Sequence, residues 1–407
     1  MRNYAIVTAA YWGFTLSDGA LRMLVLLHFF RLGFSPFTLA LLFVLYEAAG
    51  VVANLIGGWL AVRFGIARML SFGLGLQIAS LLFLAVLDPG WGLALSVTWA
   101  VAGQGLAGVA KDLTKTASKS AIKLTAGAAG GSALFRWVAW FTGSKNAMKG
   151  IGFFLGGALL EGLGFRGGLI AMAGALALVL AGVVLSLPPL FGRAKPSATA
   201  RELFAKSRGV NLLAAARIAL FGARDVWFVV GLPVFLYAAG WSFSGVGLFL
   251  ALWTILYGAV QAAAPAMVKR SADGLSREVP AARVWAVVLA AIPALLALCL
   301  SAPLPLAPDI VVAGGLGLFG IAFAVNSSLH SYLILAYAGS EKAAEDVGFY
   351  YAANATGRLA GTLASGAFYA WGGLTACLAA SAVMLVVAAA ISLVLPARPA
   401  ASRAHAG

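Results

Sequence analysis

Charged and polar residues, spaced by one or two turns of a helix, interrupt several long apolar stretches of this sequence. The pairs four residues apart are Asp18 with Arg22, Lys145 with Lys149, Asn326 with His330 and Asn354 with Arg358. Arg217 and Arg224 are seven residues apart. On a helix, side chains at these spacings share one face, so each pair predicts a polar ridge. Arginine offers a planar fork that fits phosphate or carboxylate oxygens, and lysine offers a point charge, so such ridges are suited to binding anions.

The charges within these apolar stretches are not balanced. Six are basic, namely Arg22, Lys145, Lys149, Arg217, Arg224 and Arg358, and three are acidic, namely Asp18, Glu47 and Asp225. A charge near the centre of a membrane helix costs about 2.5–3.5 kcal/mol on insertion scales, so each needs a partner or a function. Asp18 with Arg22, and Arg224 with Asp225, could simply neutralise each other. The remaining cations predict an anionic ligand, which we expect to contact also Asn146, Asn326, Tyr332 and Asn354.

The composition places these stretches in a membrane. Hydrophobic residues make up 62% of the 407 residues and charged residues 10%, whereas soluble domains carry about 25% charged residues. The 28 Lys and Arg outnumber the 13 Asp and Glu, which gives a net charge of +15. We therefore expect the chain to be surrounded by membrane lipid and to have no nucleic-acid partner.

Apolar runs of about 20 residues predict twelve membrane helices. They are residues 4–30, 37–62, 69–87, 91–110, 134–161, 167–187, 210–237, 243–268, 283–300, 310–337, 347–369 and 373–396. Twenty Lys and Arg fall in the segments of one side, and only Arg31 and Arg166 fall in the loops of the other. An excess of basic residues marks the cytoplasmic side, so we expect both termini in the cytoplasm of a multi-pass protein in a bacterial inner membrane.

The chain also contains an internal repeat. A shift of 207 residues aligns Asp18 with Asp225, the GFS turn at 33–35 with the GWS turn at 240–242, and Asn54 with Gln261. Parallel repeats build the two halves of major facilitator transporters. We therefore predict an all-α integral membrane protein with a twelve-helix major facilitator fold. Its parts are a six-helix half at 1–187, a cytoplasmic linker at 188–209, a second six-helix half at 210–396 and a cytoplasmic tail at 397–407.

Two short motifs resemble those of major facilitator transporters. Residues 58–65 (GWLAVRFG) resemble the loop motif G-x-L-A-D-R-x-G, with Val62 in place of the acid and Arg63 retained. Residues 152–159 (GFFLGGAL) resemble the antiporter motif G-P-x-x-G-G-x-L, with Phe153 in place of proline. In that fold, the third helix of each triplet lies outside against lipid. None of the nine charges falls on such a helix, which predicts that they line a central cavity.

A basic stripe follows the fourth predicted helix. It consists of Lys111, Lys115, Lys119 and Lys123, with Asp112 beside the first. The stripe could anchor the cytoplasmic side of the protein. Alternatively, it could act with Arg63 as a cytoplasmic gate or funnel that steers an anion towards the cavity.

A more specific resemblance is carried by six blocks that occur in order. They are YWGFTLSDGALRML at 11–24, AKDLTK at 110–115, TGSKNA at 142–147, FGARDVWF at 221–228, HSYLILAY at 330–337 and DVGFYY at 346–351. Together they resemble organoarsenical efflux permeases of the ArsJ type, from residue 1 to about 396. The resemblance implies an exporter of 1-arseno-3-phosphoglycerate that confers arsenate resistance. It also implies a functional partner, a glyceraldehyde-3-phosphate dehydrogenase that makes this substrate from arsenate.

The sequence predicts a transporter without a cofactor, a metal or catalytic residues. A site for trivalent arsenic would need cysteine thiolates. The two cysteines, Cys299 and Cys377, fall instead on helices 9 and 12, which are expected to face lipid. The chain has no His/Asp metal cluster, no G-x-S-x-G motif and no glycine-rich phosphate loop. A membrane enzyme is disfavoured for this reason, and an exporter of organic cations is disfavoured because the cavity would repel them.

We expect transport by alternating access of the two halves about a site near the membrane midplane. Proton antiport is the favoured coupling, with Glu47, Asp18, Asp225 and His330 as candidate proton carriers, since histidine titrates near neutral pH. Substrate-driven exchange and uniport stay open as other forms of coupling. An organophosphate or phosphate exchanger of the same fold stays open as another function.

Overall fold

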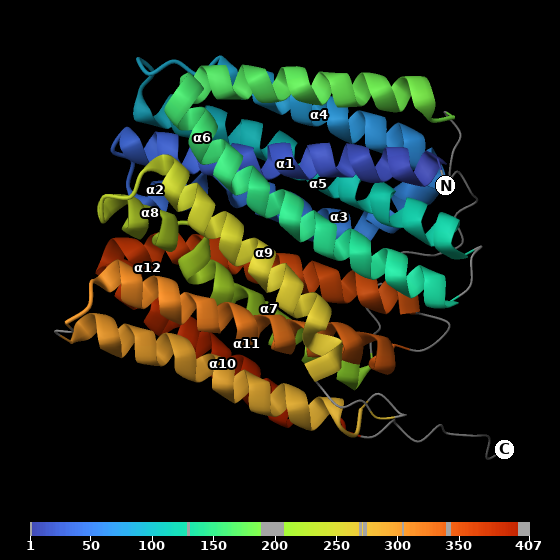
Figure 1. Cartoon of the computed structure of the whole chain (residues 1–407), viewed down its shortest axis with the longest axis vertical. Coiled ribbons are helices and arrows are strands. Elements are labelled where there is room, and N and C mark those ends of the chain that lie inside the picture. The colour runs from blue at the N-terminus through green and yellow to red at the C-terminus, as the bar shows by residue number, and fades with distance from the viewer. Residues whose placement is uncertain are drawn as a thin grey trace.

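The computed structural model describes residues 2–127, 131–188, 207–267, 271, 275–302, 305–338 and 343–397, and every regular element within them is a helix (Figure 1). The helices are α1 (Arg2–Arg31), α2 (Pro36–Leu41), α3 (Val44–Phe64), α4 (Ile66–Ala85), α5 (Leu93–Gly127), α6 (Gly131–Ser186), α7 (Arg208–Phe228), α8 (Gly231–Ala238), α9 (Phe243–Met267), α10 (Glu278–Ser301), α11 (Pro308–Tyr337) and α12 (Ala343–Leu393).

These helices provide twelve membrane crossings. Ten candidate spans occur among the described residues, and the two within α6 and α12 are 43 and 48 residues long. At 1.5 Å per residue, such lengths are about twice the 30 Å thickness of the hydrocarbon core. The reason is that α6 reverses at Gly164 (φ 70°) and α12 reverses at Gly372 and Gly373 (φ 62° at the latter), so each crosses twice. The predicted all-helical, twelve-crossing fold is therefore confirmed.

The helices form two groups that follow the order of the chain (Figure 1). Most contacts of α1 to α6 are made within that group, and most contacts of α7 to α12 within the other, except that α2 packs mainly on α12 and α9 mainly on α6. Contacts between the groups run from α6 to α9 and from α2 and α3 to α12. The predicted division at 188–209 and the tail at 397–407 stay predictions, because residues 189–206 and 398–407 lie outside the described part.

The two turns aligned by the repeat have the same geometry. Gly33 and Gly240 both take left-handed backbone angles, with φ of 85° and 92°, which glycine adopts without strain. Each is followed two residues later by a serine whose hydroxyl accepts a bond from a backbone N–H three residues on. These bonds are 3.2 Å for Ser35 and 3.0 Å for Ser242. The same chain reversal therefore leads into α2 and α9.

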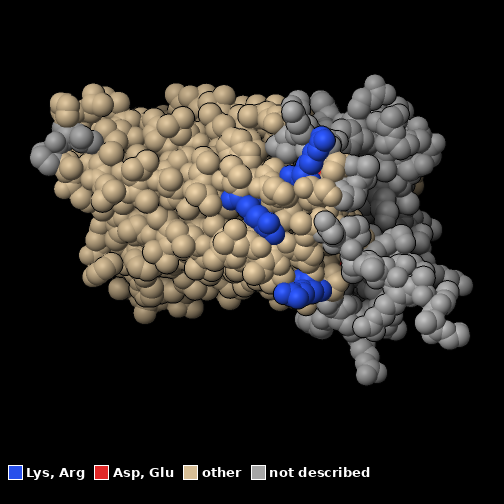
Figure 2. Space-filling view, turned by 90° about the horizontal axis from the view of Figure 1, so that it is seen from below, with Lys and Arg blue, Asp and Glu red and all other residues tan. Residues whose placement is uncertain are grey.

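Large apolar side chains cover the outside of the bundle. Leu178 and Leu185 of α6 and Leu298 of α10 are 77%, 86% and 66% exposed. They belong to the third helix of a triplet, as expected for helices that face lipid. Figure 2 shows one face that is mostly uncharged, with a few basic side chains towards one end of its coloured part. Cys377 is an exception to the expected lipid-side position, because it is completely buried.

Candidate functional site

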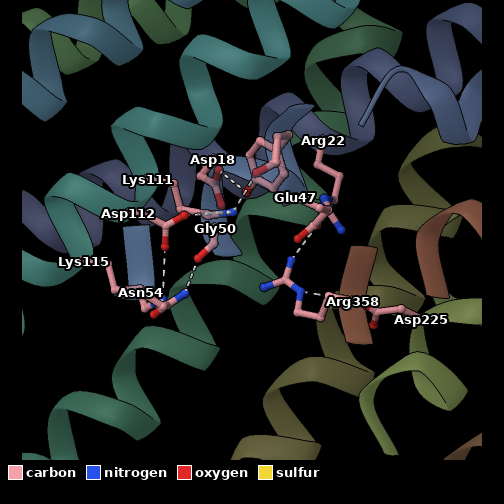
Figure 3. A network of polar contacts seen from close by, with 11 residues as sticks. Asp18, Arg22, Glu47, Gly50, Asn54, Lys111, Asp112, Lys115, Asp225 and Arg358 are labelled. Atoms are coloured by element: carbon pink, nitrogen blue, oxygen red, sulfur yellow. Dashed lines mark hydrogen bonds and ion pairs between the residues drawn. The ribbon is translucent and has the colours of Figure 1, made fainter. Parts of the chain in front are cut away.

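Five charged side chains form a chain of ion pairs in the middle of the bundle (Figure 3). Glu47 of α3 is 1% exposed and accepts hydrogen bonds from Arg22 of α1 and, at 2.7 Å, from Arg358 of α12. Arg358 Nε also lies 3.5 Å from a carboxylate oxygen of Asp225 in α7, which pairs with Arg224 at 2.5 Å. This central chain joins the first group of helices to the second and carries three guanidinium groups against two carboxylates.

Close helix packing brings these charges within reach of one another. A Cβ atom on Gly357 would lie only 2.4 Å from the carbonyl oxygen of Ile218, so glycine allows α12 to lie directly against α7. The next residue, Arg358, thereby reaches Asp225. Gly152 of α6 has the same role against α1, where a Cβ would lie 2.5 Å from a backbone oxygen.

Asp18 and Arg22 do not pair with each other, which answers a question that the sequence left open. Asp18 accepts a 2.6 Å hydrogen bond from the Tyr46 hydroxyl, while Arg22 pairs with Glu47. The Tyr46 ring lies 5.0 Å from the Arg22 guanidinium carbon and 3.7 Å from Lys111 Nζ. Both are cation–π distances. Tyr46 was not predicted from the sequence, although it directly precedes the buried acid Glu47.

The basic stripe predicted to follow the fourth helix is part of that helix. α5 continues to Gly127, so Lys111 and Asp112 lie inside the bundle with 13% and 2% exposure. Lys115 pairs with Asp112 at 3.1 Å and donates a 2.9 Å hydrogen bond to Asn54 of α3 (Figure 3). The predicted end at residue 110 was too early, because polar residues that pair inside a bundle interrupt the apolar run without ending the helix.

Lys149 of α6 has no carboxylate partner among the described side chains. Its ammonium lies 5.5 Å from the centre of the Phe153 ring. Arg358, Arg22 and Arg224 are near enough to repel it, and Asp18 is near enough to attract it. Lys149 is therefore left without an ion pair among the described residues, beside the three arginines of the central chain.

Polar contacts one turn earlier in α6 reach helices of both groups. Asn146 donates to Gln261 of α9 at 3.5 Å, which joins a predicted site residue to the amide that the repeat aligns with Asn54. Trp12 of α1 donates to Ser144 at 3.0 Å. Lys145, between these two positions, is half-buried.

Arg217 of α7 does not join the ion pairs of the central chain. It is 3% exposed, and its Nη1 donates to the carbonyl oxygen and the hydroxyl of Ser327 in α11, at 3.2 and 3.1 Å. The guanidinium carbons of Arg217 and Arg224 lie 4.1 and 4.8 Å from the centre of the same Phe221 ring. The shared face predicted from their spacing is therefore present, with Phe221 between them.

The other predicted site residues are distributed over α11 and α12. Asn326 and His330 are buried, and His330 lies near Arg217, whereas Asn354 and Tyr332 are half-buried. The side chains of Arg63, Lys119 and Lys123 lie outside the described residues. Within the described part of the chain, no three His, Cys, Asp or Glu residues are placed to hold a metal ion.

Twelve helical crossings in two groups, with buried ion pairs where the groups meet, define a polytopic membrane transporter. The chain belongs to the Major Facilitator Superfamily, whose family model matches residues 5–344. No curated protein matches the sequence.

Solved transporter structures share the fold over almost the entire chain. One is described as a proton-dependent oligopeptide transporter, with a TM-score of 0.69 and 14% identity over 97% of both chains. Another is a bacterial homologue of the human drug peptide transporters PepT1 and PepT2, with a TM-score of 0.67, 14% identity and the same coverage. At this identity the likeness establishes the fold alone.

Proposed function

We propose that this protein exports a small organic polyanion, 1-arseno-3-phosphoglycerate, from the bacterial cytoplasm across the inner membrane. The observation that carries the proposal is a pair of cations, the half-buried Lys149 and the buried Arg217, that form no ion pair with a described carboxylate. A charge inside the bundle without a partner is costly, and an anionic substrate would balance it. The block-by-block resemblance to organoarsenical permeases supplies the specific substrate.

The chemistry of this substrate fits separated cationic groups. It carries a phosphate at one end and an arsenate at the other, and both present oxygens to hydrogen-bond donors. We assign Arg22, Lys145 and Lys149 to contacts from the first half and Arg217, Arg224 and Arg358 to contacts from the second. Lys111 and Lys115, with Asp112 and Arg63, would form the cytoplasmic funnel through which the anion enters.

The central chain suggests how binding leads to transport. Glu47 and Asp225 hold arginines that an incoming anion also needs, so substrate competes with these carboxylates. Their release would loosen the connection between the halves and permit alternating access. A displaced carboxylate could take up a proton, which keeps Glu47, Asp225, Asp18 and His330 as the candidates for proton antiport.

Arsenate resistance in cells that lack their own arsenic exporters tests the proposal. We expect resistance only when the chain is expressed together with a glyceraldehyde-3-phosphate dehydrogenase that accepts arsenate. Lys149→Gln should abolish resistance, whereas Arg166→Gln, at an exposed position outside the cavity, should retain it. Resistance without the dehydrogenase, or none with it, would contradict the assigned substrate.

An organophosphate or phosphate exchanger is the second candidate, because the same arginines fit a phosphate end equally well. Counterflow in proteoliposomes separates the two functions. Exchange driven by glycerol 3-phosphate as fast as that driven by the arsenylated product would favour the exchanger.

A further inference from the structure

A compact group of buried polar side chains surrounds Arg217 between α7, α11 and α12. Besides Ser327, it includes His330 of α11, which is 1% exposed and near enough to feel the charge of Arg217. The Tyr350 ring of α12 lies 4.9 Å from the Arg217 guanidinium carbon and is also buried. We call these four residues the Arg217 pocket.

Several strong hydrogen-bonding atoms in the Arg217 pocket have no partner among the described residues. They are Arg217 Nε and both ring nitrogens of His330. Each unpaired buried polar atom costs about 1–3 kcal/mol, and a charged group costs more. Native proteins rarely leave so many unpaired in one place, so something other than protein completes the pocket.

The charge of the pocket identifies the class of ligand. Arginine stays protonated in proteins, and no described carboxylate pairs with Arg217. Its guanidinium donates to a carbonyl and a hydroxyl, which are neutral, so its positive charge is not compensated. Water could satisfy the hydrogen bonds, but only an anion would also balance the charge. An oxyanion would accept from Arg217 Nε and from an N–H of His330.

The position of the pocket relates it to the central chain. Arg217 and Arg224 lie over the same Phe221 ring, and Arg224 belongs to the central chain through Asp225. Two cationic groups are thus held apart by one aromatic ring, one towards the middle of the bundle and one towards the start of α7. This spacing suits a small molecule with an anionic group at each end.

We propose that the Arg217 pocket is a second anion subsite, which binds one oxyanion end of a transported molecule whose other end lies at Lys149 and Arg224. The proposal rests on the proposed function and makes it narrower: the substrates are two-ended anions, and molecules with one anionic end bind weakly. The polar atoms of the pocket are buried here, so the subsite fills as the helices around it rearrange.

Ligand binding by the full-length protein in lipid nanodiscs tests this subsite. The probes are 3-phosphoglycerate, which has a phosphate and a carboxylate, glycerol 3-phosphate, which has one anionic end, and inorganic phosphate. We expect wild type to bind 3-phosphoglycerate about 10- to 100-fold more tightly than glycerol 3-phosphate, the value of one charged hydrogen-bond contact. Arg217→Gln should remove this preference, whereas Arg166→Gln, at an exposed position outside the cavity, should keep both the preference and the affinity for glycerol 3-phosphate.

His330→Gln carries the same prediction if Arg217→Gln does not fold. Equal binding of the two organic probes by wild type, or an unchanged preference in both variants, would overturn the subsite and leave water as the occupant. Arg217-dependent binding of inorganic phosphate alone would also overturn it, because the pocket would then hold a free anion. Failure of wild type to bind any of the probes would count against the proposed function itself.

Discussion

Five cations inside the bundle fall into two groups that differ in what neutralises them. Arg22, Arg358 and Arg224 each hold a carboxylate of the chain, whereas Lys149 and Arg217 have none among the described residues. A carboxylate of the protein fixes a charge within the fold, and removing it is costly. A cation left unneutralised keeps its affinity for an incoming anion. The first group therefore connects the halves, and the second is the better candidate for holding cargo.

The largest effect on stability is expected from Glu47→Gln. This change leaves Arg22 and Arg358 buried without the carboxylate they share, and breaking such a pair costs about 3–5 kcal/mol. Thermal unfolding in nanodiscs measures the loss. The matched control is Glu161→Gln, because Glu161 also bonds across the groups, to Ser244, but is exposed. Equal unfolding temperatures for the two variants would show that the central chain does not hold the halves together.

A smaller effect is expected from Gly357→Ala, which acts on the same connection through packing. The added methyl group would press against the backbone of α7 and move Arg358 away from Asp225, at a cost of about 1–3 kcal/mol. Gly174→Ala is the control, since a Cβ there meets nothing within 4 Å. If Gly357→Ala is as stable and active as Gly174→Ala, the close packing of α12 on α7 does not contribute to the connection between the halves.

The smallest effect on stability is expected from Lys149→Gln. In this variant the effect on stability and the effect on transport should differ most. Its ammonium is repelled by three arginines, attracted by Asp18 and forms no ion pair with a described acid, so the free energy of unfolding should stay the same or rise. Transport should nevertheless be lost. Arg358→Gln should lower both, because it leaves Glu47 and Asp225 with fewer partners. A Lys149→Gln protein that unfolds as easily as Arg358→Gln would abolish the distinction between the two groups.

The sequence was sufficient for the fold and for the identity of most buried charges. Apolar runs fixed the crossings because lipid requires about 20 apolar residues for each. The repeat located the equivalent turns at Gly33 and Gly240, since only a few residue types accept that backbone geometry. Helical spacing also placed Arg217 and Arg224 on one face of α7.

The partners of these charges could not be predicted. Spacing places Asp18 and Arg22 on one face but says nothing about which other helix each side chain reaches, and they bond to Tyr46 and Glu47. The inward position of Lys111 could not be predicted for a related reason. Its partners are Tyr46 of α3 and Asp112 of α5. Hydropathy gives a lysine that is paired inside a bundle the same value as a lysine at the exposed end of a helix.

The most direct test of the central claim is uptake into everted membrane vesicles that contain the protein. Arsenate, phosphate-labelled glyceraldehyde 3-phosphate, NAD and the dehydrogenase are supplied outside, so that the substrate forms at the cytoplasmic face. We predict that arsenic and label accumulate inside in equal amounts, and that Lys149→Gln abolishes uptake of both. Accumulation of arsenic without the label, or without the dehydrogenase, would contradict the proposal that this cationic interior carries the arsenylated polyanion.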